Sequence, residues 1–216
     1  MITVIGFGRE RQLACGLAVL LCLGACSNEE PEGEHADSGD GVEAGEHQAA
    51  GSAGGDESGE AVVANLRRTV GIAHEKFMAL AEAMPEEDYA WAPMDDVRSV
   101  GDVFIHVAAD NWFGPALMDI EAPEWTGVTT ADEDVRAYQE RPVTKEQILE
   151  EMEVSFQHLL AAMDATGSRA GEMIDLRGNP LTVADLWVRL VVHMHEHLGQ
   201  SVAYARSREV VPPWSR

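Results

Sequence analysis

Four long segments of this 216-residue chain repeat apolar side chains at the spacing of an α-helix. No segment alternates apolar and polar residues over a sustained run, as a half-buried strand does. Helices of this length have to bury their apolar stripes against one another. The pattern therefore predicts an all-α four-helix bundle, with helices over residues 60–84, 99–115, 144–166 and 182–206.

The ends of these helices are marked by residues that cap or stop a helix. Pro85 follows the first helix, and Pro115 ends or kinks the second. The other three starts have the spacing of a capping box: Ser99 with Asp102, Thr144 with Gln147, and Thr182 with Asp185. The connection from 121 to 142 is long enough for a crossover, and a short helix is expected near 132–138.

The N-terminus has the order of a secretory lipoprotein signal. Arg9 and Arg11 precede an apolar run, 13–23, which is too short for an ordinary membrane span. Residues 23–26 (Leu-Gly-Ala-Cys) are typical of a bacterial lipoprotein cleavage box, which predicts Cys26 as the lipidated first residue of the mature chain. The alternative is an ordinary signal peptide that contains cysteines. We expect an extracytoplasmic protein that is anchored to a membrane through Cys26.

Three parts of the chain are expected from its composition. Residues 1–25 are the signal peptide, and residues 26–59 are the lipidated cysteine and a tether. The tether is rich in Glu, Asp, Gly, Ser and Ala, which bury too little apolar surface to offset the entropy of ordering, so we expect it to be disordered. Residues 60–216 are the four-helix domain.

Cysteine placement and net charge exclude several functions. All three cysteines, Cys15, Cys22 and Cys26, lie before the tether, so the domain has no disulfide, thiolate nucleophile or cysteine metal ligand. Any metal site in the domain must use histidine and carboxylate. The net charge of −23 argues against nucleic acid as a partner, and against anionic lipid surfaces except through the lipid anchor.

The fourth helix carries a pair of histidines at ligand spacing. His193 and His197 lie about 40° apart around a helix axis and one turn apart along it, so both imidazoles can reach one metal ion. They continue the stripe of Leu186 and Leu190, where core residues are expected, and burying two imidazoles without partners is costly. The alternatives to a metal pair are a hydrogen-bonded core pair or an exposed helix end. His195 points nearly the opposite way.

A third ligand has to come from another helix. His106 is the first candidate, because it lies beside the buried face of the second helix, with Asp110 one turn later on the same side. His74 on the first helix is the second candidate, and His158 on the third helix is the last. Glu196 borders the stripe and is positioned to orient a histidine.

Two motifs resemble the DinB-like (DinB/YfiT) superfamily. Residues 98–108 (RSVGDVFIHVA) look like its second-helix motif, and residues 193–200 (HMHEHLGQ) look like its fourth-helix motif. The resemblance implies a four-helix bundle with a divalent metal on three histidines, which here are His106, His193 and His197. Some members of the family are S-transferases or isomerases that use small thiols, and others look like hydrolases.

Together these features predict a membrane-tethered, metal-dependent hydrolase or transferase that acts on a small molecule. Glu196 or Asp110 is expected to assist as a base. Zinc suits imidazole ligands best, and nickel, iron or manganese stay open. The alternative is a non-catalytic metal-binding or scaffolding lipoprotein, or a module that binds a periplasmic partner. The sequence also leaves a homodimer open.

Overall fold

The computed structural model describes residues 53–215. The predicted signal peptide, Cys26 and most of the predicted tether lie outside the described residues. In the described part of the chain, no helix is both long and apolar enough to cross a membrane.

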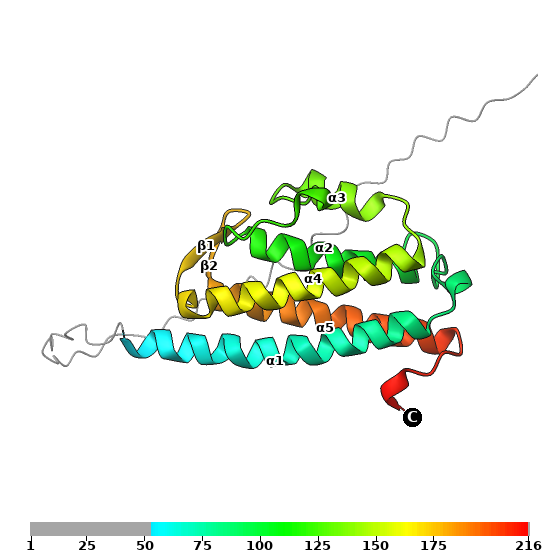
Figure 1. Cartoon of the computed structure of the whole chain (residues 1–216), viewed down its shortest axis with the longest axis horizontal. Helices are drawn as coiled ribbons and strands as arrows, with labels where there is room; N and C mark the ends of the chain where they lie inside the picture. The colour runs from blue at the N-terminus through cyan, green and yellow to red at the C-terminus, as the bar shows by residue number, and fades with distance from the viewer. Residues whose placement is uncertain (1–52, 216) are drawn as a thin grey trace, which may run out of the picture. The chain divides into compact units, whose positions relative to one another are not determined.

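Four long helices form the bundle that the sequence predicts (Figure 1). They are α1 (Ala53–Ala83), α2 (Val100–Ala116), α4 (Lys145–Thr166) and α5 (Val183–Ser207). The helices α1 and α2 do not neighbour each other closely; each packs against both α4 and α5. Chain direction follows from the colours of Figure 1, in which α2 and α4 run the same way and α1 and α5 run the opposite way.

The parallel run of α2 and α4 requires a connection that returns along the bundle. The short helix α3 (Asp132–Glu140) lies in this connection and packs on α2. This arrangement confirms the predicted crossover and its short helix. Tyr138 anchors α3, because its hydroxyl donates to Glu151 on α4 and accepts from the indole of Trp112 on α2.

Three of the four long helices begin where the capping residues predict. Ser99, Thr144 and Thr182 each accept a hydrogen bond from the backbone N–H three residues on, and the side chain at that position returns one. The first helix differs, because α1 begins at Ala53, so residues 53–59 are helical and not part of the tether as expected. Tertiary packing explains the longer helix: a Cβ built on Gly59 would lie 2.8 Å from the Cβ of Ala170.

A small β-hairpin was not predicted. Strands β1 (Met173–Leu176) and β2 (Asn179–Thr182) pair antiparallel just before α5. Arg177 and Gly178 form the turn with φ of 55° and 82°, which is the left-handed pair that a tight hairpin requires. Each strand is only four residues long, so neither shows a periodicity. Four single-turn 3₁₀ helices complete the described elements: η1 (Glu86–Asp88), η2 (Glu124–Thr126), η3 (Gly167–Arg169) and η4 (Pro213–Ser215).

The apolar core fills the space between the four helices and changes character along α5. Leu186 and Trp187, in the first turns of α5, are buried, and the Trp187 indole donates to Thr166. Further along the helix, Met194 and Leu198 remain in the apolar core, and histidine, glutamine and tyrosine form a partly buried stripe beside them. A polar stripe therefore begins at His193 alongside the apolar face, and this turn faces the middle of α2.

Candidate metal centre

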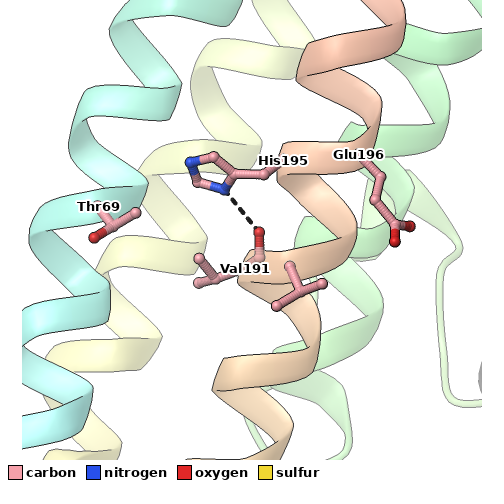
Figure 2. Close-up of a pocket in the computed structure, with 5 residues that line it drawn as sticks. Thr69, Val191, His195 and Glu196 are labelled. Atoms are coloured by element: carbon pink, nitrogen blue, oxygen red, sulfur yellow. Dashed lines mark hydrogen bonds between the residues drawn. The ribbon is translucent and has the colours of Figure 1, made fainter.

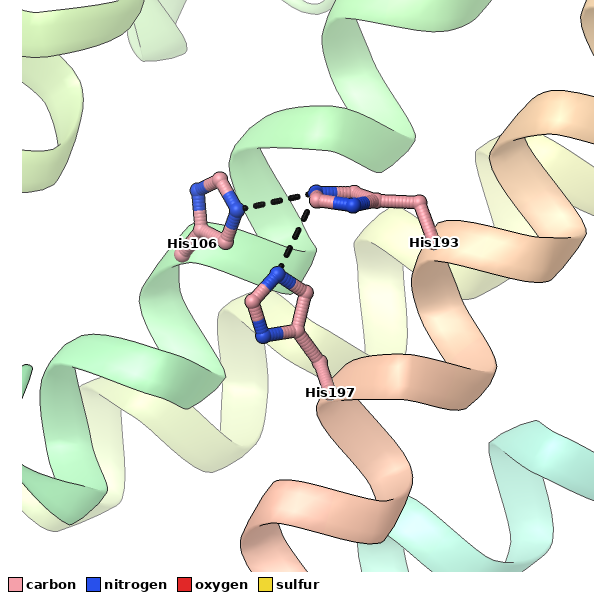
Figure 3. Close-up of side chains that lie close together, drawn as sticks. All are labelled: His106, His193 and His197. Atoms are coloured by element: carbon pink, nitrogen blue, oxygen red, sulfur yellow. Dashed lines mark hydrogen bonds between the residues drawn. The ribbon is translucent and has the colours of Figure 1, made fainter. Parts of the chain in front are cut away.

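Three histidines from two helices meet inside the bundle. His106 projects from α2, and His193 and His197 project from α5 toward it (Figure 3). The Nε2 atom of His193 lies 3.1 Å from Nε2 of His106 and 3.2 Å from Nε2 of His197. One ligand atom from each of the three residues lies within 4.8 Å of the others. The structure thus brings together the three residues that the sequence selects.

The outer nitrogens of the three rings face oxygen atoms. Nδ1 of His197 lies 2.8 Å from the amide oxygen of Gln200, and Nδ1 of His106 lies 3.3 Å from that of Gln139. Nδ1 of His193 lies 3.6 Å from a carboxylate oxygen of Glu196, which is an ion-pair contact and too long for a hydrogen bond. An amide oxygen only accepts, so Nδ1 of His106 and of His197 carry the proton when these bonds form. Their Nε2 lone pairs then face the centre of the cluster.

The distances fit a metal ion better than they fit hydrogen bonds alone. A hydrogen bond between two imidazole nitrogens requires a proton on one of them. Two contacting nitrogens that both lack a proton repel each other through their lone pairs. Two nitrogens bound to one zinc ion at about 2.0–2.1 Å lie roughly 3.3 Å apart at a tetrahedral angle. The two short Nε2–Nε2 distances of 3.1 and 3.2 Å are close to that value. The three histidines could therefore hold a metal ion.

Asp110 adds a negative charge to the same cluster. Its Oδ2 atom lies 3.1 Å from Nε2 of His193 and 3.4 Å from Nε2 of His106. This oxygen is sealed from solvent and makes no hydrogen bond of good geometry within the described part of the chain. A buried carboxylate oxygen without such a bond is costly unless a cation compensates it. A metal ion on the three rings, or a protonated His193, would supply that positive charge.

Burial and the neighbouring charges set the protonation of the cluster. Burial lowers the pKa of His106 to about 4 and also lowers the pKa of His197. His193 behaves oppositely, because its close contact with the Asp110 carboxylate raises its pKa above the ordinary value. Burial alone raises the pKa of Asp110, but the charges of His106 and His193 outweigh it and leave that pKa lowered. The cluster therefore carries an ionised Asp110 beside a His193 that binds a proton readily.

Solvent reaches the cluster from the side of His193. His106 and His197 are 6% and 9% exposed, whereas the side chain of His193 is 31% exposed. The side chain of Asp110 is partly exposed beside it. Solvent therefore contacts the cluster through the His193 ring, while the other two rings are buried.

The remaining candidate residues lie away from the centre. His195 points toward α1 and binds the carbonyl oxygen of Val191 over 2.8 Å, as predicted for a residue outside the site. It lines an open, mostly apolar pocket of about 530 Å³ together with Thr69 and Glu196, and none of the three clustered histidines lines that pocket (Figure 2). The side chain of Glu196 is 66% exposed, so its contact with His193 is a solvated one.

The two competing ligands have other partners. His74 lies 2.8 Å from a carboxylate oxygen of Glu153 and stacks on Phe156. His158 packs against Trp112. Neither belongs to the cluster, so the ranking that placed His106 first agrees with the geometry.

Two polar residues near the centre were missed as site residues by the sequence reasoning. Gln139 comes from α3 in the crossover, and no periodicity could indicate that it touches His106. Arg98 precedes α2, and a terminal nitrogen of its guanidinium lies 3.4 Å from Nδ1 of His106. Its place in the motif eight residues before His106 was the only available signal.

Fold and cluster together define a class: four-helix bundles that present three histidines, one from the second long helix and two from the last, to a single point. The chain belongs to the DinB superfamily, whose sequence pattern matches residues 47–201. The match covers α1 to α4, the hairpin and most of α5, including all three histidines. No curated protein matches the sequence.

Proposed function

We propose that this DinB-superfamily protein holds one divalent ion on His106, His193 and His197 and uses it in hydrolysis or group transfer on a small molecule. The observation that carries the proposal is the direction of the rings: the three Nε2 atoms converge while Nδ1 of His106 and of His197 faces an amide oxygen. Outer hydrogen bonds of this kind orient histidine ligands in metal sites. Zinc is the ion we favour, with nickel, iron or manganese as alternatives.

Three neutral imidazoles leave coordination positions for an exogenous ligand, which distinguishes catalytic from structural sites. A divalent ion would supply Lewis acidity, lowering the pKa of water or of a thiol and polarising an electrophile. Asp110 is placed to accept a proton next to the centre, because its Oδ2 lies within 3.4 Å of two of the rings. Glu196 is exposed and contacts only the outer nitrogen, Nδ1, of His193, so its role is at most to orient that ring.

The same position of Asp110 supports a second candidate function. A carboxylate oxygen so close to His106 and His193 could close the coordination shell as a fourth protein ligand. The centre would then be structural, and the protein a metal-binding or scaffolding lipoprotein. The two functions differ in what Asp110→Ala does. If Asp110 is a ligand, the variant should lose about as much metal affinity as a variant that lacks one of the histidines. If Asp110 is a base, the variant should keep its metal and lose turnover.

Metal content tests the first step of the proposal. The full chain should bind about one zinc ion per molecule in elemental analysis and in competition with a chromophoric chelator. His106→Ala, His193→Ala and His197→Ala should each weaken binding by more than the roughly 100-fold typical of losing an outer hydrogen bond to a ligand. His195→Ala is the matched control and should leave affinity unchanged. Equal effects at 193 and 195, or no bound metal in the parent protein, would refute the assignment.

Turnover tests the second step. Ester, amide and thiol-acceptor substrates should be screened with zinc-loaded protein, with the metal-free protein and the His193→Ala variant as blanks. Replacement of zinc by cobalt adds a measurement that does not depend on the choice of substrate. A visible spectrum that responds to added small ligands indicates an open position, and one that does not respond, together with Asp110-dependent affinity, favours the structural alternative.

The membrane tether belongs to the proposal as well. It is supported by the order of basic, apolar and small residues that ends at Cys26. An anchor of this kind would hold the domain at the outer side of the membrane it is inserted in, with small molecules as its substrates.

A further inference from the structure

Arg98 is the arginine near the centre, and its charge is poorly compensated. In the described part of the chain, the other arginines that are partly buried, such as Arg141 and Arg169, form ion pairs with carboxylates. Arg98 is half-buried and forms no such pair there. Burial lowers the pKa of its guanidinium, although the charges of Asp110 and Asp102 act in the opposite direction. Only one of its N–H donors contacts an acceptor among the described residues, so the others can bind a ligand from outside the chain.

The contact of Arg98 with His106 depends on the proton at Nδ1. That nitrogen lies 3.4 Å from the Arg98 guanidinium and 3.3 Å from the amide oxygen of Gln139. Without a proton it accepts from Arg98, and with a proton it donates to Gln139. A metal ion on Nε2 of His106 requires the second state. Metal binding therefore removes the only acceptor that the described residues give the Arg98 guanidinium.

A second donor without an acceptor lies near the cluster. The phenol oxygen of Tyr204 accepts a hydrogen bond of 2.9 Å from the amide nitrogen of Gln200, and its own O–H has no acceptor among the described residues. Gln200 also lies 2.8 Å from Nδ1 of His197, so Tyr204 lies beside the cluster. The ring of Trp91 packs edge-to-face on Tyr204, with centroids 5.5 Å apart, and limits its movement. Arg98 and Tyr204 thus offer N–H and O–H donors at the edge of the centre.

We infer that the substrate carries a carboxylate, which the guanidinium of Arg98 and the hydroxyl of Tyr204 bind beside the metal centre. This inference rests on the proposed function, because it requires the metal. A divalent metal and Arg98 would offset the nearby carboxylates of Asp110, Asp102 and Glu196, so the loaded site can accept an anion within a chain whose net charge is −23. Among the described residues, Arg98 is the one arginine or lysine that contacts a histidine of the cluster, which suits a monoanion. A guanidinium fork matches the planar carboxylate geometry.

Benzoate and benzamide are suitable probes, because they have the same shape and differ in charge. They should be titrated into the zinc-loaded full chain by calorimetry and into the cobalt-loaded chain by visible absorption. Benzoate should bind, benzamide should bind at least tenfold more weakly, and Arg98→Gln should weaken benzoate binding on the order of tenfold or more. Tyr204→Phe should weaken it severalfold. Arg68→Gln, an equal charge change at an exposed position of α1, should have no effect.

Metal affinity measured in the same samples separates the two levels of the proposal. If the parent chain binds no metal, the proposed function fails and the carboxylate site fails with it. If metal binds but benzoate does not, or if benzoate binds equally to the parent and to Arg98→Gln, only the carboxylate site is overturned. If Arg98→Gln does not fold, Arg98→Lys, which keeps the charge and loses the fork, replaces it and should bind benzoate more weakly than the parent. Tighter Arg98-dependent binding of inorganic phosphate than of benzoate would contradict the carboxylate class.

Discussion

The Oδ2 atom of Asp110 on α2 lies 3.1 Å from Nε2 of His193 on α5, and this contact links the charge of one helix to the metal-ligating nitrogen of another. It raises the pKa of His193, whereas burial lowers the pKa values of His106 and His197. When one of the three rings in the metal-free protein takes up an additional proton and becomes cationic, that ring is therefore mainly His193. A metal ion can bind this nitrogen only after that proton leaves.

Metal binding should release a proton at pH values below the raised pKa of His193, and affinity should increase as pH rises through that pKa. His106 adds no competing proton until pH falls to about 4. Calorimetry in buffers of different ionisation enthalpy measures the release. In Asp110→Asn the pKa of His193 loses its support, so the release at the same pH should be smaller. Equal release in the two proteins would show that Asp110 does not control the proton.

Gln200 should contribute to metal affinity without touching the metal. Its amide oxygen lies 2.8 Å from Nδ1 of His197 and holds that ring with Nε2 facing inward. Gln200→Leu keeps the size of the side chain and removes the acceptor, and loss of such a partner typically weakens a metal site about 10- to 100-fold. Chelator competition measures the change. Gln157→Leu, at an exposed position of α4, should have none, and an unchanged affinity in Gln200→Leu would argue against this role.

Local sequence rules were sufficient for most of the fold. The capping boxes at Ser99, Thr144 and Thr182 fix helix starts through bonds between residues three apart, so they can be recognised in the sequence. The start of α1 could not be predicted in the same way. It depends on the close approach of Gly59 and Ala170, which lie far apart in the sequence. The hairpin was missed because four-residue strands are too short for a periodic signal.

The site shows the same division between local and long-range information. The pair of His193 and His197 follows from helix geometry, and the place of Gln200 on the same stripe is visible in the sequence. Gln139 is different, because the crossover brings α3 over α2 and places its amide at His106. The inferred role of Arg98 in binding a carboxylate depends on the lack of an ion-pair partner among the described residues. The sequence contains no direct signal of that lack.

Replacing Cys26 tests the predicted anchor, which lies outside the described residues. Lipid attachment requires the thiol of this residue, so Cys26→Ser should yield an unprocessed precursor or protein released from the membrane fraction. Cell fractionation with immunoblotting measures the distribution, and circular dichroism should show unchanged helix content. Cys22→Ser lies within the apolar run and serves as the control, which should fractionate as the parent does. Membrane association that persists unaltered in Cys26→Ser would exclude the lipoprotein assignment.

Tyr138→Phe should reduce both stability and, more weakly, metal affinity. The hydroxyl accepts from the indole of Trp112 and donates to Glu151, so its removal leaves a buried indole N–H unpaired and costs about 1–3 kcal/mol of unfolding free energy. Loosening of α3 should also move Gln139 away from His106 and lower metal affinity severalfold.

The matched control for this variant is Tyr89→Phe. Its hydroxyl donates to the carbonyl oxygen of Ala81, which has no helical partner because Pro85, four residues on, lacks an N–H. Its loss should therefore destabilise the bundle by a similar amount, about 1–3 kcal/mol, because it leaves a buried carbonyl unpaired. Urea unfolding of the metal-free proteins measures both losses, and chelator competition measures the affinities. If Tyr89→Phe lowers metal affinity as much as Tyr138→Phe does, the effect reflects general loosening of the bundle and not the position of Gln139.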